Sequence, residues 1–403
     1  MRVLLSTYGS RGDVEPLVGL AVRLREFGAE VRVCAPPDED FARRLAGVGV
    51  PMTPVYQSAR ALTKAVHAPG DLPRRAAELI AGQLDPLREA GEGCDVLVAT
   101  GAMPAMAGAL SVAEKLGVPA VSVTFQQLTL PSPYHAPLAY PGRPFPPGVT
   151  DSRKLWELDA ESVNALFGEA LNTGRASIGL PPVADVRDYV VGDRPWLATD
   201  PVLDPWLTPA DLDPVQTGAW IQPDERPLDA GLLSFLDAGE PPVYVGFGSM
   251  PMHTSADAAR VAIDAVRAQG RRVLLSHGWA DLSPIDGQAD CFAVGEANHQ
   301  ALFPRVAAVV HHGGAGTTTT AARAGVPQVV VPQAVDQPYW AARVTDLGIG
   351  AAHAGPTPTF ASLSAALDTA LLPGTLARAT AVAGTVRTDG TTVAARLLLE
   401  GVG

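Results

Sequence analysis

The segment 311–318, which reads His-His-Gly-Gly-Ala-Gly-Thr-Thr, contains the residues best suited to bind an anion. The apolar run 307–310 before it predicts a buried strand, and the Ala-rich stretch 319–324 after it predicts a helix that stops at Gly325. Glycines between a strand and a helix leave backbone N–H groups free at the positive end of the helix dipole, which is an anion-binding arrangement. Histidine and threonine side chains add further donors. The segment therefore predicts an anion site that suits a diphosphate.

A Gly-rich turn can also do no more than join a strand to a helix. Two observations favour the anion site here. The adjacent histidines have no evident packing role in a tight turn, and Asp336 and Gln337 follow the next predicted strand, 328–331. Successive strand ends that carry polar residues line one edge of a parallel sheet, where open α/β sheets bind their ligands.

Asp13 follows the first predicted strand, 2–6, and stands at the start of a predicted helix, 14–27. As a helix N-cap it would stabilise the protein by about 1 kcal/mol, and the local sequence alone favours that interpretation. The alternative is a general base at the mouth of a cleft, which requires a second domain to present a diphosphate. Gly9 and Gly12 form only G-x-x-G, so this is neither a dinucleotide fingerprint nor a P-loop.

Composition limits the class of protein. A chain of 403 residues predicts two or three domains, and 47% hydrophobic with 18% charged residues indicates a globular chain with a core. The net charge of -12 argues against nucleic acid as a partner. The three dispersed cysteines are expected to be reduced core thiols, and we expect a cytoplasmic protein without a membrane span or signal peptide.

Strands and helices alternate in both halves, which predicts an α/β chain with two doubly wound parallel sheets facing a cleft. The expected domains are 1–215, a linker at 216–241, a second domain at 242–385 and a C-terminal helix at 386–403 that packs back on the first domain. Seven prolines interrupt the pattern at 131–147, where Tyr134, His135 and Tyr140 also lie. Long loops in compact domains are usually functional, so these aromatic residues are predicted to bind an acceptor; a surface excursion without a role is the alternative.

Four motifs together carry a family resemblance: 9–16 (Gly-Ser-Arg-Gly-Asp-Val-Glu-Pro), 295–303 (Gly-Glu-Ala-Asn-His-Gln-Ala-Leu-Phe), 311–317, and 331–338 (Val-Pro-Gln-Ala-Val-Asp-Gln-Pro). Over the whole chain the sequence resembles an inverting glycosyltransferase of the GT-B class. It is most similar to the family 1 enzymes that glycosylate vancomycin-group glycopeptide antibiotics. The resemblance implies two Rossmann-like domains with a central cleft, the first binding the acceptor and the second binding a nucleotide sugar.

The resemblance also implies roles for single residues. Asp13 matches the general base on the acceptor hydroxyl, and Arg11 is expected to favour its ionised form. His312, which starts the H-x-G-x-x-T spacing, matches the pyrophosphate ligand, whereas His311 is expected to end the strand. The other predicted donor-binding residues are Ser10, Arg11, Ser249, Trp279, Gly313, Gly314, Ala315, Gly316, Thr317, Asp336 and Gln337.

The implied reaction is an in-line displacement at the anomeric carbon of a UDP- or dTDP-sugar by a hydroxyl of a glycopeptide aglycone or pseudoaglycone. No metal or cofactor is expected, because the helix dipole and donors meet the charge of the leaving group. A monomer is expected, because no heptad pattern runs through the chain. The alternatives are transfer to a macrolide or polyketide, a sugar-nucleotide epimerase, and a non-catalytic sugar-binding module. The sequence does not separate the candidate sugars, nucleotides or acceptor hydroxyls.

Overall fold

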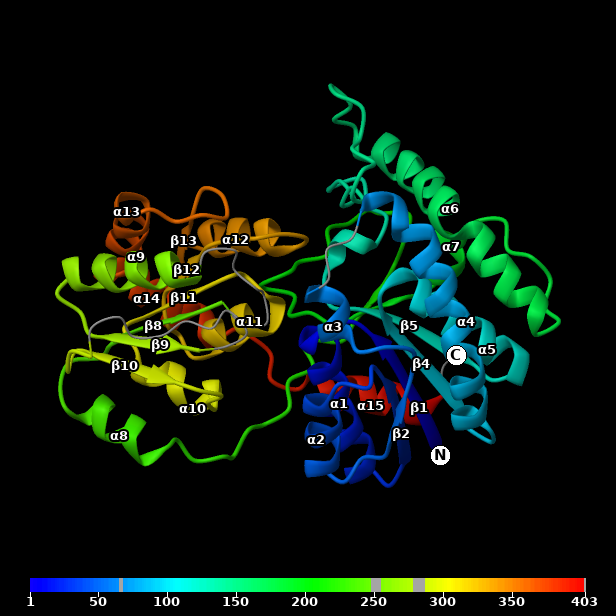
Figure 1. Cartoon of the computed structure of the whole chain (residues 1–403), viewed down its shortest axis with the longest axis horizontal. Helices are drawn as coiled ribbons and strands as arrows, with labels where there is room; N and C mark the ends of the chain where they lie inside the picture. The colour runs from blue at the N-terminus through cyan, green and yellow to red at the C-terminus, as the bar shows by residue number, and fades with distance from the viewer. Residues whose placement is uncertain (65–67, 248–254, 278–286, 402–403) are drawn as a thin grey trace. The chain divides into compact units, whose positions relative to one another are not determined.

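The computed structural model describes residues 1–64, 68–247, 255–277 and 287–401 (Figure 1). The chain forms two compact units. Unit 1 comprises Met1–Asp200, Pro205–Gln222 and Thr388–Gly403, and unit 2 comprises Pro201–Asp204 and Pro223–Arg387. The chain thus enters unit 2 briefly at Pro201–Asp204 and again after Gln222, which lies inside the predicted linker 216–241.

Unit 1 is built around a parallel sheet that has seven strands in the described residues, in the order β3-β2-β1-β4-β5-β6-β7. The strands are β1 (Arg2–Tyr8), β2 (Glu30–Ala35), β3 (Met52–Pro54), β4 (Val96–Gly101), β5 (Ala120–Thr124), β6 (Trp196–Leu197) and β7 (Val215–Gln216). The α-helices are α1 (Arg11–Glu26), α2 (Glu39–Gly47), α3 (Ala59–Lys64), α4 (Leu72–Gly91), α5 (Met103–Leu116), α6 (Ser152–Ser177), α7 (Val186–Val191) and α15 (Gly390–Glu400), with 3-10 turns η1 (Pro69–Asp71) and η2 (Gln127–Thr129).

Unit 2 repeats this plan with six described parallel strands in the order β10-β9-β8-β11-β12-β13. The strands are β8 (Val243–Gly246), β9 (Val273–Ser276), β10 (Cys291–Val294), β11 (Ala308–His311), β12 (Gln328–Val330) and β13 (Gly350–Ala352). The helices are α8 (Ala230–Asp237), α9 (Ser255–Ala268), α10 (His299–Leu302), α11 (Ala315–Arg323), α12 (Gln337–Asp346), α13 (Phe360–Ala370) and α14 (Pro373–Ala383), with the 3-10 turn η3 (Phe303–Arg305).

Helices cover both faces of the sheet in unit 1, which is why its central strands are apolar on both sides. On one face, α1 and α15 lie side by side (Figure 1), and both contribute to the same core cluster. In α15 the buried residues include Ala394, Ala395 and Leu398. The C-terminal helix is therefore part of unit 1.

Two predicted elements differ in the structure, and one helix was not predicted. Helix α11 begins at Ala315, not at residue 319, because Gly314 takes the extended N-cap conformation; Ala315, Gly316 and Thr317 thus form its first turn. The predicted linker 216–241 contains helix α8, which buries Leu232, Phe235 and Leu236 in unit 2. Helix α4, which was not predicted, packs against α5 and α6 in unit 1.

The three cysteines are free thiols; Cys34 and Cys94 are buried and Cys291 is half-buried. Among the described helices, no single one has the length and apolar content to cross a membrane. One bent pair, α13 with α14, meets that test on length and composition alone.

Candidate functional site

The Gly-rich turn joins β11 to α11 in unit 2, and glycine is required at two of its positions. Gly313 has φ +93°, and a Cβ there would lie 2.7 Å from Cγ1 of Val330. A Cβ on Gly314 would lie 2.7 Å from Nε2 of His312. Any side chain at these positions would displace the sheet or the imidazole, so the turn can bring its backbone close to a ligand only with glycine.

His311 ends β11, as the spacing predicts, and is completely buried. Its Nε2 lies 2.8 Å from Oε1 of Gln328, and its Nδ1 accepts the backbone N–H of Gly313 at 3.1 Å. The acceptor role of Nδ1 places the proton on Nε2. Burial, and then the neighbouring His312, lower the pKa of His311 to about 3. His311 is a structural residue that fixes the start of the turn.

His312 is also buried, with 9% of its surface exposed, but its Nδ1 has no hydrogen-bond partner in the described part of the chain. Burial lowers the pKa of His312 to about 4, so the ring is neutral near pH 7. A neutral imidazole offers one N–H donor, and a buried polar atom without a partner is unfavourable by about 1–3 kcal/mol. An anion at the turn would remove that penalty.

Four consecutive threonines occupy the first turns of α11, and one of them differs from the rest. The hydroxyls of Thr318, Thr319 and Thr320 each donate to the carbonyl four residues earlier, at 3.0, 2.8 and 2.8 Å. Among the described residues the half-buried Thr317 makes no such bond. Its hydroxyl therefore remains available beside the helix N-terminus, where an anion is favoured.

Asp336 and Gln337 lie at the start of α12, after β12, on the same edge of the sheet as the Gly-rich turn. Oε1 of Gln337 accepts the backbone N–H groups of Gln333 and Ala334 at 2.7 and 3.2 Å, which closes a tight turn. Oδ2 of Asp336 accepts the indole N–H of Trp340 at 2.8 Å. Burial raises the pKa of the Asp336 carboxyl, although the indole bond opposes this shift.

Asp13 lies in the first turn of α1, at the carboxyl edge of the sheet in unit 1. The structure shows Ser10, rather than Asp13, as the N-cap. Oδ2 of Asp13 accepts the backbone N–H of Ser10 at 2.7 Å, and Oγ of Ser10 accepts the N–H of Gly12 at 3.1 Å. This capping box holds the half-buried carboxylate in one orientation.

Gly9 and the nearby ion pairs of Glu15 shape the surroundings of the Asp13 carboxylate. Gly9 makes room for it, because a Cβ at Gly9 would lie 2.1 Å from Oδ2 of Asp13. The exposed Arg11 pairs with Glu15 at 3.1 Å, and Glu15 also pairs with Arg44 at 3.0 Å. The expectation that Arg11 favours the ionised form of Asp13 stays a prediction.

The predicted acceptor residues occupy different environments in unit 1. Tyr134 is 46% exposed. Tyr140 is half-buried against Phe167 of α6, with ring centroids 5.5 Å apart, and burial raises the pKa of its phenol. His135 lies edge-on to Trp156 of α6, whose indole N–H donates to the His135 carbonyl at 2.9 Å. Helix α6 thus anchors the Pro-rich segment.

Ser249 and Trp279, both predicted donor contacts, lie outside the described residues. Of the remaining predicted residues, Ser10, Arg11 and Asp13 belong to unit 1, and those of the segments 312–317 and 336–337 belong to unit 2. The described residues include no group of three or more His, Cys, Asp or Glu side chains placed to hold a metal ion.

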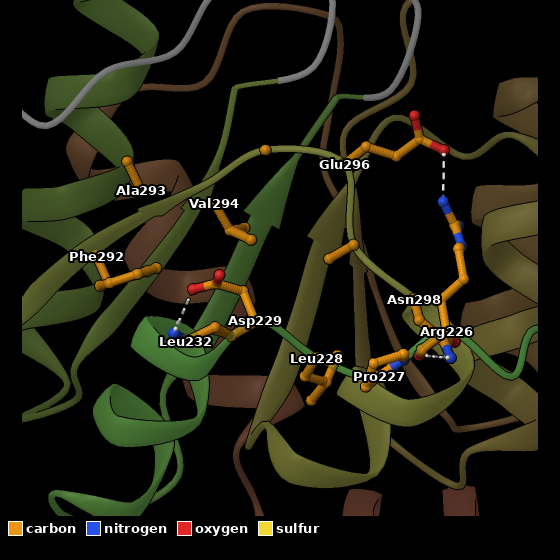
Figure 2. A pocket seen from close by; sticks show the side chains of 12 residues that line it. Arg226, Pro227, Leu228, Asp229, Leu232, Phe292, Ala293, Val294, Glu296 and Asn298 are labelled. Atoms are coloured by element: carbon orange, nitrogen blue, oxygen red, sulfur yellow. Dashed lines mark hydrogen bonds and ion pairs between the residues drawn. The ribbon is translucent and has the colours of Figure 1, made fainter.

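A hollow of about 400 Å³ lies elsewhere in unit 2, between the segment before α8 and strand β10. Figure 2 shows Arg226 and Glu296 on its rim, joined by an ion pair of 3.3 Å. Arg226 also pairs with Asp224 at 2.7 Å, and Asp229 caps α8. Because its charged groups already have partners, this hollow is a weaker candidate for an anion than the Gly-rich turn.

Comparison with known proteins decides the family. The glycosyltransferase family 28 N-terminal domain matches residues 3–130, and the C-terminal domain of proteins like erythromycin biosynthesis protein CIII matches residues 293–391. The chain is 58% identical to vancomycin aglycone glucosyltransferase from Amycolatopsis orientalis, across 100% of this chain and 98% of that protein. The chain belongs to the GT-B glycosyltransferases of the vancomycin group.

Other relatives of this glycosyltransferase agree. It is 54% identical to dTDP-epi-vancosaminyltransferase from Amycolatopsis orientalis, again across 100% of this chain and 98% of that protein. The solved glycosyltransferase of kitacinnamycin has a TM-score of 0.76 at 21% identity, covering 99% of this chain and 98% of that one. VinC in complex with dTDP has a TM-score of 0.69 at 21% identity, covering 99% of both chains. The fold of two parallel α/β sheets is therefore that of GT-B glycosyltransferases.

Proposed function

We propose that this glycosyltransferase transfers a sugar, with inversion, from a nucleoside-diphosphate donor to a hydroxyl of a glycopeptide aglycone or pseudoaglycone. The names of the relatives, an aglycone glucosyltransferase and a dTDP-epi-vancosaminyltransferase, support this acceptor class and donor type. The main support for the donor site is a difference in hydrogen bonding between neighbouring residues of the Gly-rich turn. Nδ1 of His312 and the hydroxyl of Thr317 have no hydrogen-bond partner among the described residues, whereas their neighbours His311 and Thr318 are bonded within the protein.

On the acceptor side, Asp13 takes the proton from the acceptor hydroxyl while the oxygen of that hydroxyl attacks the anomeric carbon of the sugar. The capping box supports this role, because it fixes the carboxylate while leaving Asp13 half-buried rather than sealed in the core. A base that is already oriented loses less entropy in the transition state.

On the donor side, the bond between the anomeric carbon and the β-phosphate oxygen breaks, and the diphosphate leaves with its negative charge increased. The backbone N–H groups at the start of α11 and the His312 and Thr317 donors would stabilise that charge. Donors that are oriented before the reaction provide much of the rate enhancement of enzymes. Asp336 and Gln337 follow the next strand on the same edge. Because Oδ2 of Asp336 and Oε1 of Gln337 are bonded within the protein, Oδ1 of Asp336 and the amide nitrogen of Gln337 would contact the sugar hydroxyls.

A screen of UDP- and dTDP-sugars against one glycopeptide aglycone, read by mass spectrometry, tests the proposal. The expected product has the mass of the aglycone plus one sugar, and proton NMR should show the inverted anomeric configuration. Transfer to a macrolide or polyketide but not to the aglycone would contradict the acceptor class. Conversion of the donor to a stereoisomer in the absence of any acceptor would indicate an epimerase instead.

A further inference from the structure

Two neighbouring aromatic side chains in unit 1 carry buried nitrogen atoms that have no hydrogen-bond partner in the described residues. Of the seven buried side-chain nitrogen and oxygen atoms that lack a partner in the described residues, three belong to one pair of aromatic rings. They are Nδ1 and Nε2 of His135 and Nε1 of Trp206. The two rings pack edge to face with centroids 6.0 Å apart, so the orphaned nitrogens share one neighbourhood.

The topology of the sheet brings these rings together. His135 lies in the segment after β5, and Trp206 lies in the segment after β6, and the two strands are parallel neighbours. Both residues therefore follow the carboxyl ends of adjacent strands, at the edge of the sheet where Asp13 follows β1. Only β4 separates β1 from β5 in the sheet, so the pair and Asp13 follow strands that end at the same edge of unit 1.

The chemistry of the pair limits what could satisfy it. An indole N–H is only a donor, whereas a neutral imidazole has one donor and one acceptor nitrogen. Burial lowers the pKa of His135, which keeps the ring neutral near pH 7; the nearby Ala136 carbonyl opposes this shift without forming a hydrogen bond of acceptable geometry. A hydroxyl group can accept from the indole and donate to the imidazole at the same time.

We infer that Trp206 and His135 form a polar contact point for the acceptor. In it, the Trp206 N–H donates to a hydroxyl oxygen of the acceptor, and that hydroxyl donates to the unprotonated nitrogen of His135. This inference rests on the proposed function, since it assumes a hydroxyl-bearing acceptor at the edge of unit 1. The nitrogens are covered in the free protein, so binding must displace the side chains above them. Their chain neighbours Tyr134 and Leu207 are 46% and 50% exposed, so the pair lies close to the surface of unit 1.

A matched pair of variants tests the inference, because Trp156 packs against the same His135 ring but its indole N–H is already bonded. Trp206→Phe should raise the KM for the acceptor about 2- to 12-fold, the value of one net hydrogen bond, with a smaller change in kcat. Trp156→Phe loses an existing bond and strands the His135 carbonyl, so it should lower the melting temperature more than Trp206→Phe does. His135→Phe should raise the acceptor KM in the same direction as Trp206→Phe.

Assays of the wild-type enzyme and of Trp206→Phe test the proposed function and the contact point separately. If the wild-type enzyme glycosylates the aglycone and Trp206→Phe leaves the acceptor KM unchanged, the contact point is wrong and the proposed function stands. A Trp206→Phe variant that unfolds as readily as Trp156→Phe would show that Trp206 has a structural role, which also overturns the inference. If the wild-type enzyme transfers no sugar to any glycopeptide aglycone, the proposed function fails and the acceptor assignment fails with it.

Discussion

His311 and His312 are adjacent in the sequence and opposite in their hydrogen bonding. Both ring nitrogens of His311 have partners, Gln328 and Gly313, whereas Nδ1 of His312 has none in the described residues. The strand explains the difference. His311 is the last residue of β11 and faces a neighbouring strand, while His312 already belongs to the turn at the ligand edge.

His312→Ala should therefore weaken binding of a free nucleoside diphosphate by about 1–3 kcal/mol, as expected for a hydrogen bond to a charged group. Calorimetric titration measures this directly. His311→Ala is the matched control, because it leaves Gln328 and Gly313 without their partner and should mainly lower the free energy of unfolding. Equal losses of affinity in the two variants would show that the histidines do not have separate roles.

Thr317→Val should weaken diphosphate binding by about 1.5–3 kcal/mol while leaving stability nearly unchanged, because the Thr317 hydroxyl makes no bond within the described residues. Thr318→Val is the control with the same change in chemistry. It removes the 3.0 Å bond to the Gly314 carbonyl and should lower stability by about 1 kcal/mol with little effect on affinity. The assignment of Thr317 to the donor site would be wrong if its variant bound the diphosphate as tightly as the wild type does.

Asp13→Asn should lower kcat by roughly 10²–10⁴-fold, the usual contribution of a general base, and leave diphosphate affinity similar. The asparagine can still accept the N–H of Ser10, so the capping box and the stability should be largely kept. Glu15→Gln, two residues along the same helix, removes the ion pairs with Arg11 and Arg44 and should leave kcat within a few-fold. A steady-state rate for Asp13→Asn close to that of the wild type would rule out the base.

The free energy of unfolding should fall as the pH falls from about 6.5 toward 4, in part because of His312. The folded state holds this ring neutral with a pKa of about 4, so in that window the unfolded chain binds a proton that the folded chain does not. His312→Gln should have a flatter pH profile than the wild type in urea unfolding. His312→Gln must be compared with the wild type, because Asp159 acts in the opposite direction. Burial raises the pKa of Asp159 to about 6, so its protonation stabilises the folded state as the pH falls.

Val335→Gly should raise the free energy of unfolding by about 1 kcal/mol. Val335 has φ +57°, a conformation that strains a β-branched residue by about 1–3 kcal/mol. Glycine relieves this strain, but its greater conformational entropy in the unfolded chain cancels part of the gain in stability. Little burial is lost, because Val335 is 65% exposed. A clear loss of stability in urea unfolding would show that Val335 makes contacts that outweigh the strain.

Much of the fold follows from local pattern. The predicted strand 2–6 lies within β1, and the predicted helix 14–27 overlaps α1, which runs from Arg11 to Glu26. Helix α4 was not predicted, although its buried residues Leu79, Ile80, Leu84 and Leu87 repeat at helical spacing and Pro73 stands in its first turn, where proline is favourable; only Pro86 interrupts the pattern. The start of α11 was misplaced because glycine at 314 and 316 suggests a loop, whereas in the structure only Gly314 lies outside the helix.

The sequence alone determined that the chain repeats an α/β plan and that a Gly-rich turn follows a buried strand in the second half, since both depend on residues close together in the chain. It also predicted Asp13 and His312 as site residues, from the short motifs that carry the family resemblance. Only the tertiary structure decided which of these groups are already bonded. Gln328 hydrogen-bonds the ring of His311, and Trp340 donates its indole N–H to Asp336. The rings of His135 and Trp206, whose nitrogens lack partners in the described residues, come together from segments that follow different strands. Hydrogen-bond partners come from segments distant in the sequence, so the free donors that can hold a ligand are visible only after the chain has folded.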